Sequence, residues 1–143
     1  MRMRRRGKEG DPKIERLARL SIFADCRKSE LAEIARLVDE VEVPRGRKLM
    51  VEGRPGWEAF VIEEGEATVS IGERNVASIG PGAVLGEHAL AGEGYRAATV
   101  TADTDMCLLV ADTRGFAALR DHGTVARRID EQIALRSSAP PGS

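Results

Sequence analysis

The sequence has few cysteines, few aromatic residues and no long apolar run. Only two cysteines, Cys26 and Cys107, occur among its 143 residues, which excludes a disulfide framework and fits a reducing, cytoplasmic setting. Aromatic residues make up 3% of the chain, so the core must be built mainly from Val, Ile, Leu and Ala. No apolar run approaches the ~20 residues of a membrane-spanning helix, and no apolar segment follows the basic N-terminus as in a secretory signal.

The remaining composition is typical of one soluble globular domain. Hydrophobic residues make up 42% of the chain and charged residues 31%. The net charge of −1 hides five basic residues within positions 1–8, followed by an acidic body in which Glu63, Glu64 and Glu66 are predicted to be solvated. A short basic arm makes too few phosphate contacts to bind nucleic acid well on its own. Residues 1–10 are therefore predicted to be a solvated, disordered arm and not a nucleic-acid-binding segment.

Helical patterns lie towards both ends of the chain. Asp11-Pro12 is a typical helix start, and Ser29 is the predicted N-cap of a second helix. Helical periodicity returns at 112–119 and in a last amphipathic helix that ends near Arg136. The remaining residues, 137–143, are predicted to be a disordered tail.

Between these helices the apolar runs are short and are separated by glycine and proline. This spacing is typical of an antiparallel sandwich or barrel. The predicted fold class is therefore α+β, mainly β, with an antiparallel β-roll and flanking helices in one domain over residues 11–136. The predicted strands are Val41–Val43, Lys48–Val51, Ala59–Ile62, Ala67–Ile71, Val76–Ile79, Ala98–Ala102 and Cys107–Val110.

One segment of the β region, Leu85–Ala102, has residues suited to a phosphorylated ligand. Gly86 allows the backbone to approach a ligand closely. Glu87 to Leu90 can form one helical turn whose first amides point outward as an anion site, and Arg96 offers a planar fork of donors for a phosphate. Together these groups suit a ligand with both a hydroxyl and a phosphate, such as a sugar phosphate or a nucleotide.

This segment resembles the phosphate-binding cassette of cyclic nucleotide-binding domains, in which F-G-E-x-A-L and P-R-x-A-T-V flank a variable loop. The matching residues are Gly86, Glu87, Ala89, Leu90, Arg96, Ala97, Ala98, Thr99 and Val100. Further similarities at Ile22-Phe23, Gly53, Val61–Gly65, Gly82 and Gly115-Phe116 extend the resemblance over about residues 14–135. The resemblance implies an eight-stranded, jelly-roll-like double-stranded β-helix with closing helices at its C-terminal end.

The resemblance also implies a role for each cassette residue. Glu87 would accept a hydrogen bond from the ribose 2′-hydroxyl, and Arg96 would pair with the equatorial oxygen of the cyclic phosphate. Amides of Ala89 and Ala97 would complete the anion cradle, and alanine at position 97 implies a preference for cAMP, with cGMP possible. The implied contact set is Gly86, Glu87, His88, Ala89, Leu90, Arg96, Ala97 and Ala98.

Three residues depart from the family pattern. Leu85 stands where phenylalanine is common, a tolerable apolar change. His88 stands where an apolar residue is usual, and it either faces solvent or gives binding a pH dependence near neutrality. Tyr95 replaces the proline before the arginine, so the loop is expected to be looser and the affinity lower. An alternative to ligand binding is that Glu87 and Arg96 simply form an internal ion pair.

Related domains cover the base with a residue of the final helix, often an aromatic one. No aromatic residue occurs from Thr124 to Arg136. Arg127 and Arg128, whose guanidinium planes can stack on a base, are therefore the candidate base caps. The alternative is that both pair with Asp130 and Glu131 on the surface of the helix.

No catalytic motif is present, so no enzyme is predicted, and no metal is expected because the two histidines, His88 and His122, lack ligand spacing. With only seven residues after Arg136, no helix-turn-helix is expected, and direct sequence-specific DNA binding is not predicted. The sequence predicts a stand-alone, cytoplasmic cyclic nucleotide sensor that signals to an unidentified effector protein by moving its flanking helices. The alternatives are a β-roll scaffold that binds no nucleotide and a DNA-associated regulator that acts through the basic arm.

Overall fold

The computed structural model describes residues 4–5, 13–86 and 95–137, and for 4–5 and 133–137 only the backbone. The described strands are β1 (Arg4–Arg5), β2 (Asp39–Val43), β3 (Lys48–Met50), β4 (Glu58–Glu64), β5 (Ala67–Ile71), β6 (Arg74–Ile79), β7 (Val84–Leu85), β8 (Thr99–Ala102) and β9 (Met106–Asp112). The described helices are α1 (Lys13–Ala18), the 3₁₀ helix η1 (Ser21–Phe23), α2 (Lys28–Leu37), α3 (Thr113–Arg120) and α4 (Gly123–Ser137).

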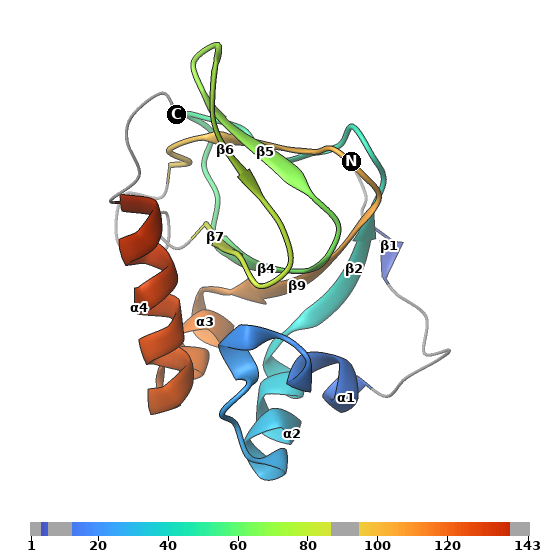
Figure 1. The fold of residues 1–143 in the computed structure, drawn as a ribbon, viewed down its shortest axis with the longest axis vertical. Coiled ribbons are helices and arrows are strands. Elements are labelled where there is room, and N and C mark those ends of the chain that lie inside the picture. Colours follow the sequence, from blue (N-terminus) through green and yellow to red (C-terminus); the bar gives the residue numbers. More distant parts are fainter. Residues whose placement is uncertain (1–3, 6–12, 87–94, 138–143) are drawn as a thin grey trace.

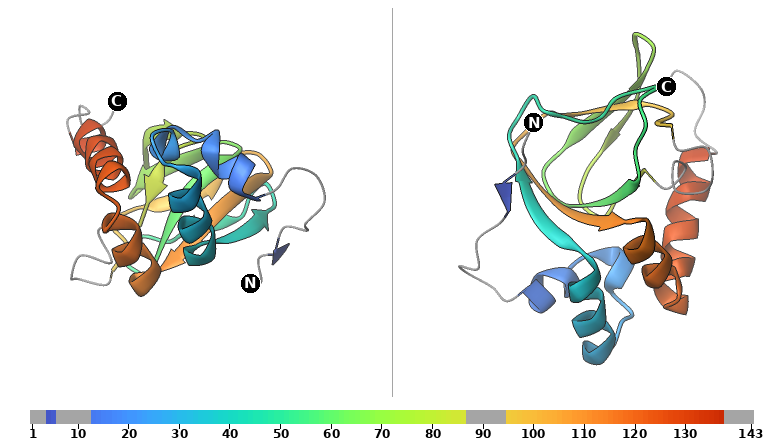
Figure 2. Two further views of the ribbon diagram at one scale, coloured as in Figure 1. Left: turned by 90° about the horizontal axis from the view of Figure 1, so that it is seen from below. Right: turned by 180° about the vertical axis from the view of Figure 1, so that it is seen from behind.

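The strands form two antiparallel sheets that curl into a roll. The larger sheet has the strand order β1-β2-β9-β4-β7, and the smaller has the order β3-β8-β5-β6. Figure 1 shows α1, α2 and α3 gathered at one end of the roll and α4 standing along its side, and Figure 2 shows the same arrangement from below and from behind. The predicted fold class, a mainly β roll with flanking helices, is confirmed.

Strand β4 is a wall shared by two hydrophobic cores. Its alternate residues Ala59 and Val61 belong to the core between the larger sheet and the helices. Phe60 and Ile62 face the other way, into the core between the two sheets. Because successive side chains of a strand point to opposite faces, this one strand fixes the helical layer and the interior of the roll relative to each other.

Each strand predicted from the sequence overlaps a strand of the structure, and three local predictions differ. Ser29 is not the N-cap, because the Glu30 carboxylate accepts the Arg27 N–H at 3.0 Å and the helix begins at Lys28. Within the predicted disordered arm, Arg4–Arg5 form β1, which pairs with β2 and supplies partners for an edge that would otherwise be open. The predicted tail starts at 137, but Ser137 is the last residue of α4, and residues 138–143 lie outside the described residues.

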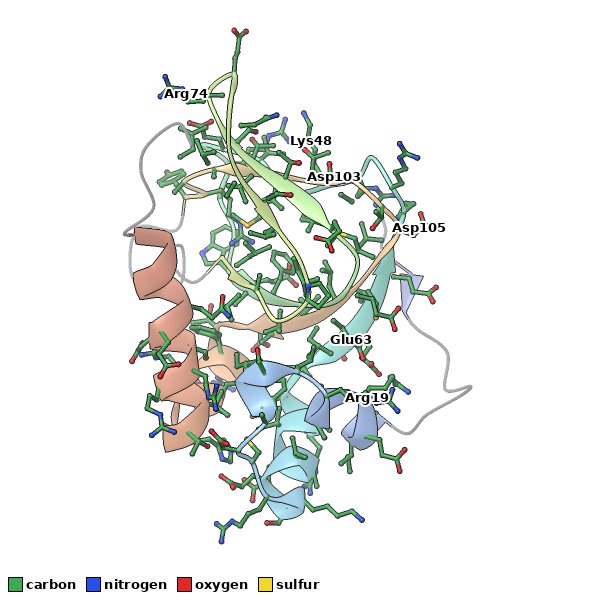
Figure 3. All side chains as sticks on the ribbon, viewed as in Figure 1. Arg19, Lys48, Glu63, Arg74, Asp103 and Asp105 are labelled. Atoms are coloured by element: carbon green, nitrogen blue, oxygen red, sulfur yellow. The ribbon has the colours of Figure 1, made fainter. Side chains whose placement is uncertain are left out.

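A buried ionic cluster joins α1 to the larger sheet. Arg16 Nε donates to Glu40 Oε2 at 3.1 Å and lies 3.4 Å from Glu63 Oε1, and the Cys107 thiol donates to Glu63 Oε2 at 2.9 Å. The Arg16 and Glu63 side chains are only 10% and 4% exposed, so the prediction of a solvated Glu63 is wrong. Figure 3 shows Glu63 at the border between the roll and the N-terminal helices, where α1 covers it.

Among the described helices, none is both long enough and apolar enough to cross a membrane.

The Arg16 cluster predicts a pH-dependent stability. Burial alone would raise the pKa of Glu40, but hydrogen bonds and charge attraction from Arg16 hold it below its ordinary value of 4.5. We expect Glu40→Gln to lower the free energy of unfolding by about 1.5–3 kcal/mol at pH 7, because Arg16 loses charge-assisted hydrogen bonds. A carboxylate with a lowered pKa stabilises the fold above its ordinary pKa and loses that contribution as the pH falls.

Urea unfolding from pH 7 to pH 3.5 measures this effect. The difference between wild type and Glu40→Gln should shrink as the pH falls below 4.5, the ordinary pKa of the group. Glu73→Gln, in the exposed turn between β5 and β6, is the matched control and should change nothing at either end of the range. A penalty for Glu40→Gln that is equally large at both ends would contradict the ionic role.

Candidate functional site

The structure describes part of the predicted cassette. Glu87, His88, Ala89 and Leu90 lie outside the described residues, and so do their implied contacts and the alternative ion pair between Glu87 and Arg96. On one side of this gap stands Gly86, directly after β7. On the other side stand buried Arg96, exposed Ala97 and half-buried Ala98, directly before β8.

The side chain of Arg96 is a buried cation. The residue is 7% exposed, its Nη1 donates to the Glu58 carbonyl at 2.9 Å, and its Cζ lies 5.5 Å from the centre of the Phe60 ring. Among the described residues it forms no ion pair. Burial lowers the pKa of the Arg96 guanidinium and the Glu58 carboxylate opposes this shift, but an arginine stays charged. A buried positive charge of this kind favours the entry of an anion.

The backbone of Arg96 is held by the loop that precedes β4. The Arg96 N–H donates to the Arg54 carbonyl at 2.8 Å, and the Gly53 N–H donates to the Arg96 carbonyl at 2.8 Å. Pro55 lies opposite Tyr95 as an isolated antiparallel bridge. These contacts fix the chain next to the position where the family has proline, although Tyr95 itself does not restrict φ.

Gly86 leaves room for the contact between Arg96 and Glu58. Its φ is +86°, a backbone conformation that favours glycine. A Cβ on this residue would lie 2.6 Å from the Glu58 carbonyl oxygen and 2.8 Å from Arg96 Nη1. The sequence analysis predicted that Gly86 lets a ligand approach; in the described part of the site its neighbours are the Arg96 side chain and the Glu58 backbone.

A cavity of about 360 Å³ opens beside Arg96. Its lining combines apolar groups, including Met50 and Phe60, with the basic residues Lys48 and Arg54. Figure 3 shows Lys48 at the end of the roll remote from the helices. Trp57, 64% exposed, stands in the same wall. The basic residues of the lining outnumber its acidic residue, Glu58, so this partly apolar site suits an anionic organic ligand.

These wall residues were missed by the sequence analysis. Gly53 was matched to the family pattern, but nothing in the sequence connected Arg54, Gly56 or Trp57 with Arg96. The available signal was an isolated tryptophan directly after a Gly-Pro turn, since an exposed indole beside a loop is typical of a binding surface.

The two candidate base caps, Arg127 and Arg128, both lie beside Asp25. Arg128 Nη2 donates to Asp25 Oδ2 at 2.6 Å, and Arg127 Nη2 lies 3.8 Å from the same oxygen. The hydrogen bond from Arg128 lowers the pKa of the Asp25 carboxyl. The expected partner Asp130 instead accepts a hydrogen bond from Arg120 at 2.8 Å, because α3 and α4 pack together there. Neither candidate cap lines the cavity beside Arg96.

One group of potential metal ligands occurs among the described residues. The ligand atoms of Glu40, Glu63 and Cys107 lie within 4.8 Å of one another. Arg16 already pairs with both carboxylates, and the Cys107 thiol donates to Glu63. The guanidinium therefore supplies the positive charge that a metal ion would bring, and the group is explained as a structural ionic cluster.

The geometry at Gly86 predicts that Gly86→Ala destabilises the protein. The left-handed φ and the clash with the Glu58 backbone should together cost about 1–3 kcal/mol of unfolding free energy in a urea titration. Gly123→Ala is the matched control, because Gly123 begins α4 with no atom within 4 Å of the new Cβ. Its stability should stay unchanged or rise slightly, since alanine favours a helix. Equal stability of wild type and Gly86→Ala would contradict this view of the site.

Comparison with known proteins places this geometry in a family. The model of the family described as "Cyclic nucleotide-binding domain" matches residues 40–122. A cyclic nucleotide-gated potassium channel of Mesorhizobium japonicum is 35% identical over 119 residues, which cover 83% of this chain and 33% of the channel. The chain spans about a third of the length of the curated relatives it matches.

Solved structures share the fold. A cAMP-binding acyltransferase from Mycobacterium smegmatis has a TM-score of 0.74 and 27% identity, covering 83% of this chain and 39% of that chain. The regulatory domain of Toxoplasma gondii PKA, solved with cAMP, has a TM-score of 0.71 and 21% identity, covering 86% of this chain and 49% of that chain. The resemblance inferred from the cassette is confirmed, and the chain belongs to the cyclic nucleotide-binding domain family.

Proposed function

We propose that this domain binds cAMP in preference to cGMP and passes its occupancy to an effector through the flanking helices. The observation that carries the proposal is Arg96, a buried guanidinium beside a cavity, with no ion-pair partner among the described residues. A buried charge without a partner is unfavourable, and a bound phosphate removes much of that penalty.

The donors of Arg96 divide between the protein and the ligand. Nη1 is engaged by the Glu58 carbonyl, whereas Nε and Nη2 have no hydrogen bond within the described residues. These two N–H groups lie on one edge of the planar guanidinium and can donate side by side to two oxygens of a phosphate. We assign this edge to the cyclic phosphate.

The remaining ligand contacts come from the family resemblance. Glu87 is proposed to accept from the ribose 2′-hydroxyl, and the amides of Ala89 and Ala97 are proposed to donate to the phosphate. Gly86, His88, Leu90 and Ala98 complete the proposed contact set. The absence of a hydroxyl at exposed Ala97 supports the preference for cAMP, since no side-chain oxygen there can bond a guanine amino group.

The proposed output is movement of the C-terminal helices. Several relatives are named as cyclic nucleotide-gated channels, in which such a domain accompanies other parts of the protein. The effector of this domain is proposed to be a protein element in contact with its helices, on the same or another polypeptide. For Arg127 or Arg128 to cap the base, the ion pair with Asp25 would have to open, which couples capping to a shift of α4.

A scaffold that binds no nucleotide explains the site less well. A protein-interaction domain has no need for a buried cation next to a cavity, and replacing the arginine by an apolar residue would remove its desolvation penalty. Calorimetric titration with cAMP separates the two functions: saturable heat supports the sensor, and a flat trace supports the scaffold.

The phosphate assignment predicts a large effect of Arg96→Ala. We expect a loss of about 2–5 kcal/mol of cAMP binding free energy by calorimetry, because a buried charged hydrogen-bonding pair is broken. Arg96→Lys should recover only part of the loss, since an ammonium cannot reproduce the planar fork. Arg74→Ala, at the far tip of the β5–β6 hairpin in Figure 3, should bind as wild type. Unchanged affinity of a folded Arg96→Ala protein would overturn the assignment.

Ligand choice generates a second prediction. Ala97→Thr should shift the ratio of cAMP to cGMP affinity towards cGMP by roughly 1 kcal/mol, the net contribution of one hydrogen bond. Ala77→Thr, exposed on β6, is the control and should leave the ratio unchanged. Competition of both nucleotides against a fluorescent cAMP analogue gives the two affinities. Tighter binding of cGMP than cAMP by the wild type would contradict the proposed preference.

A further inference from the structure

We propose that Gly56 is a positioning residue for the ligand-binding arginine, an inference that rests on the proposed role of Arg96. Gly56 is buried in the loop before β4, and Arg96 lies directly against it. A Cβ built on Gly56 would lie 2.1 Å from Arg96 Nε, 2.3 Å from Cζ and 2.6 Å from Nη2. The guanidinium therefore occupies the space that any other residue at this position would fill.

The backbone conformation does not explain why this residue is glycine. The described glycines with a left-handed φ include Gly53 and Gly86, but Gly56 is not among them. Its φ is accessible to other amino acids, so glycine is not required for the turn itself. What remains is the contact with Arg96, which only a residue without a side chain permits.

Gly56, Glu58 and Phe60 together form a seat for the guanidinium, which we call the arginine seat. Gly56 lies against the face of the guanidinium, where a Cβ would meet Nε, Cζ and Nη2. The Glu58 carbonyl accepts from Nη1 at 2.9 Å, and the Phe60 ring lies 5.5 Å from Cζ. The three residues alternate along one stretch of chain that enters β4. One short segment therefore fixes the plane and the direction of the guanidinium.

The arginine seat is itself anchored to the C-terminal part of the domain. Thr113 Oγ1, at the start of α3, donates to the Trp57 carbonyl at 3.2 Å. Glu58 lies opposite Asp112 in the pairing of β4 with β9. A site held on such a rigid support keeps its donors within the narrow geometry that bidentate binding needs.

Substitution of Gly56 should separate binding from folding. The atoms that a new Cβ would meet belong to the far end of a flexible side chain, so Arg96 can swing aside without displacing the backbone. That movement breaks the hydrogen bond from Arg96 Nη1 to the Glu58 carbonyl and moves the guanidinium donors away from the cavity. At Gly86, by contrast, the new Cβ meets a backbone oxygen and the φ is left-handed, so folding suffers as well.

The first measurement needs no ligand. The Nε–Hε signal of Arg96 in a ¹⁵N-correlated NMR spectrum, assigned by its loss in Arg96→Ala, should be slow to exchange with water in the wild type. In Gly56→Ala this signal should shift and exchange faster. Gly46→Ala, in the turn between β2 and β3, is the matched control, because its Cβ meets no atom within 4 Å while its φ of +87° perturbs a turn that does not contact Arg96. The signal should keep its slow exchange in this control.

The second measurement uses cAMP. Gly56→Ala should bind it roughly tenfold or more weakly with an unchanged urea midpoint, because a displaced fork loses its alignment. In the Arg96→Ala background, Gly56→Ala should cause no further loss, since it acts only through the arginine.

The outcomes distinguish this inference from the proposed function. An Arg96 signal that is identical in wild type and Gly56→Ala would overturn the arginine seat, whatever the ligand. A weakening by Gly56→Ala that persists in the Arg96→Ala background, or is matched by Gly46→Ala, would also overturn it. Absence of cAMP binding by the wild type, together with the expected NMR change, would overturn the proposed ligand and leave the positioning role supported.

Discussion

The candidate site depends on one buried positive charge, Arg96, which forms no ion pair within the described residues although the Glu58 carboxylate acts on it from a longer distance. Arg96 is held by a backbone carbonyl, an aromatic ring and a bare stretch of backbone, none of which carries a negative charge. Such groups can orient a guanidinium but cannot neutralise it. Within the described residues that charge is not neutralised, and the proposed function assigns its compensation to the phosphate of the ligand.

A second buried arginine makes the contrast clear. Arg16 lies at the border of the roll and the helices, and its charge is balanced by Glu40 and Glu63. Both arginines are less than a tenth exposed, Arg16 at 9% and Arg96 at 7%. Burial alone therefore does not identify a ligand site. The difference lies in the partners: internal carboxylates pair with Arg16, whereas within the described residues Arg96 donates to a neutral partner, the Glu58 carbonyl.

Sequence analysis predicted the roll and both described landmarks of the cassette, because glycine breaks, short apolar runs and the positions of Gly86 and Arg96 are local patterns. It missed the arginine seat, because the key bond joins residues 38 apart and uses the carbonyl of Glu58, a group that every residue has. It expected a solvated Glu63, since a charge in a hairpin pattern is usually exposed, whereas α1 covers it. The N-cap was misplaced because the Glu30 carboxylate caps the helix from within its first turn.

Trp57 gives this domain a built-in optical probe. It is the one tryptophan of the chain, it is 64% exposed, and it stands in the wall of the cavity beside Arg96. The Trp57 carbonyl accepts a hydrogen bond from Thr113 at the start of α3, so the backbone of Trp57 is fixed by the same contact that anchors the arginine seat. Indole emission depends on the polarity and the collisional quenching of its surroundings. Occupancy of the cavity can therefore be followed on the unlabelled protein, by the emission wavelength and the intensity of its intrinsic tryptophan fluorescence.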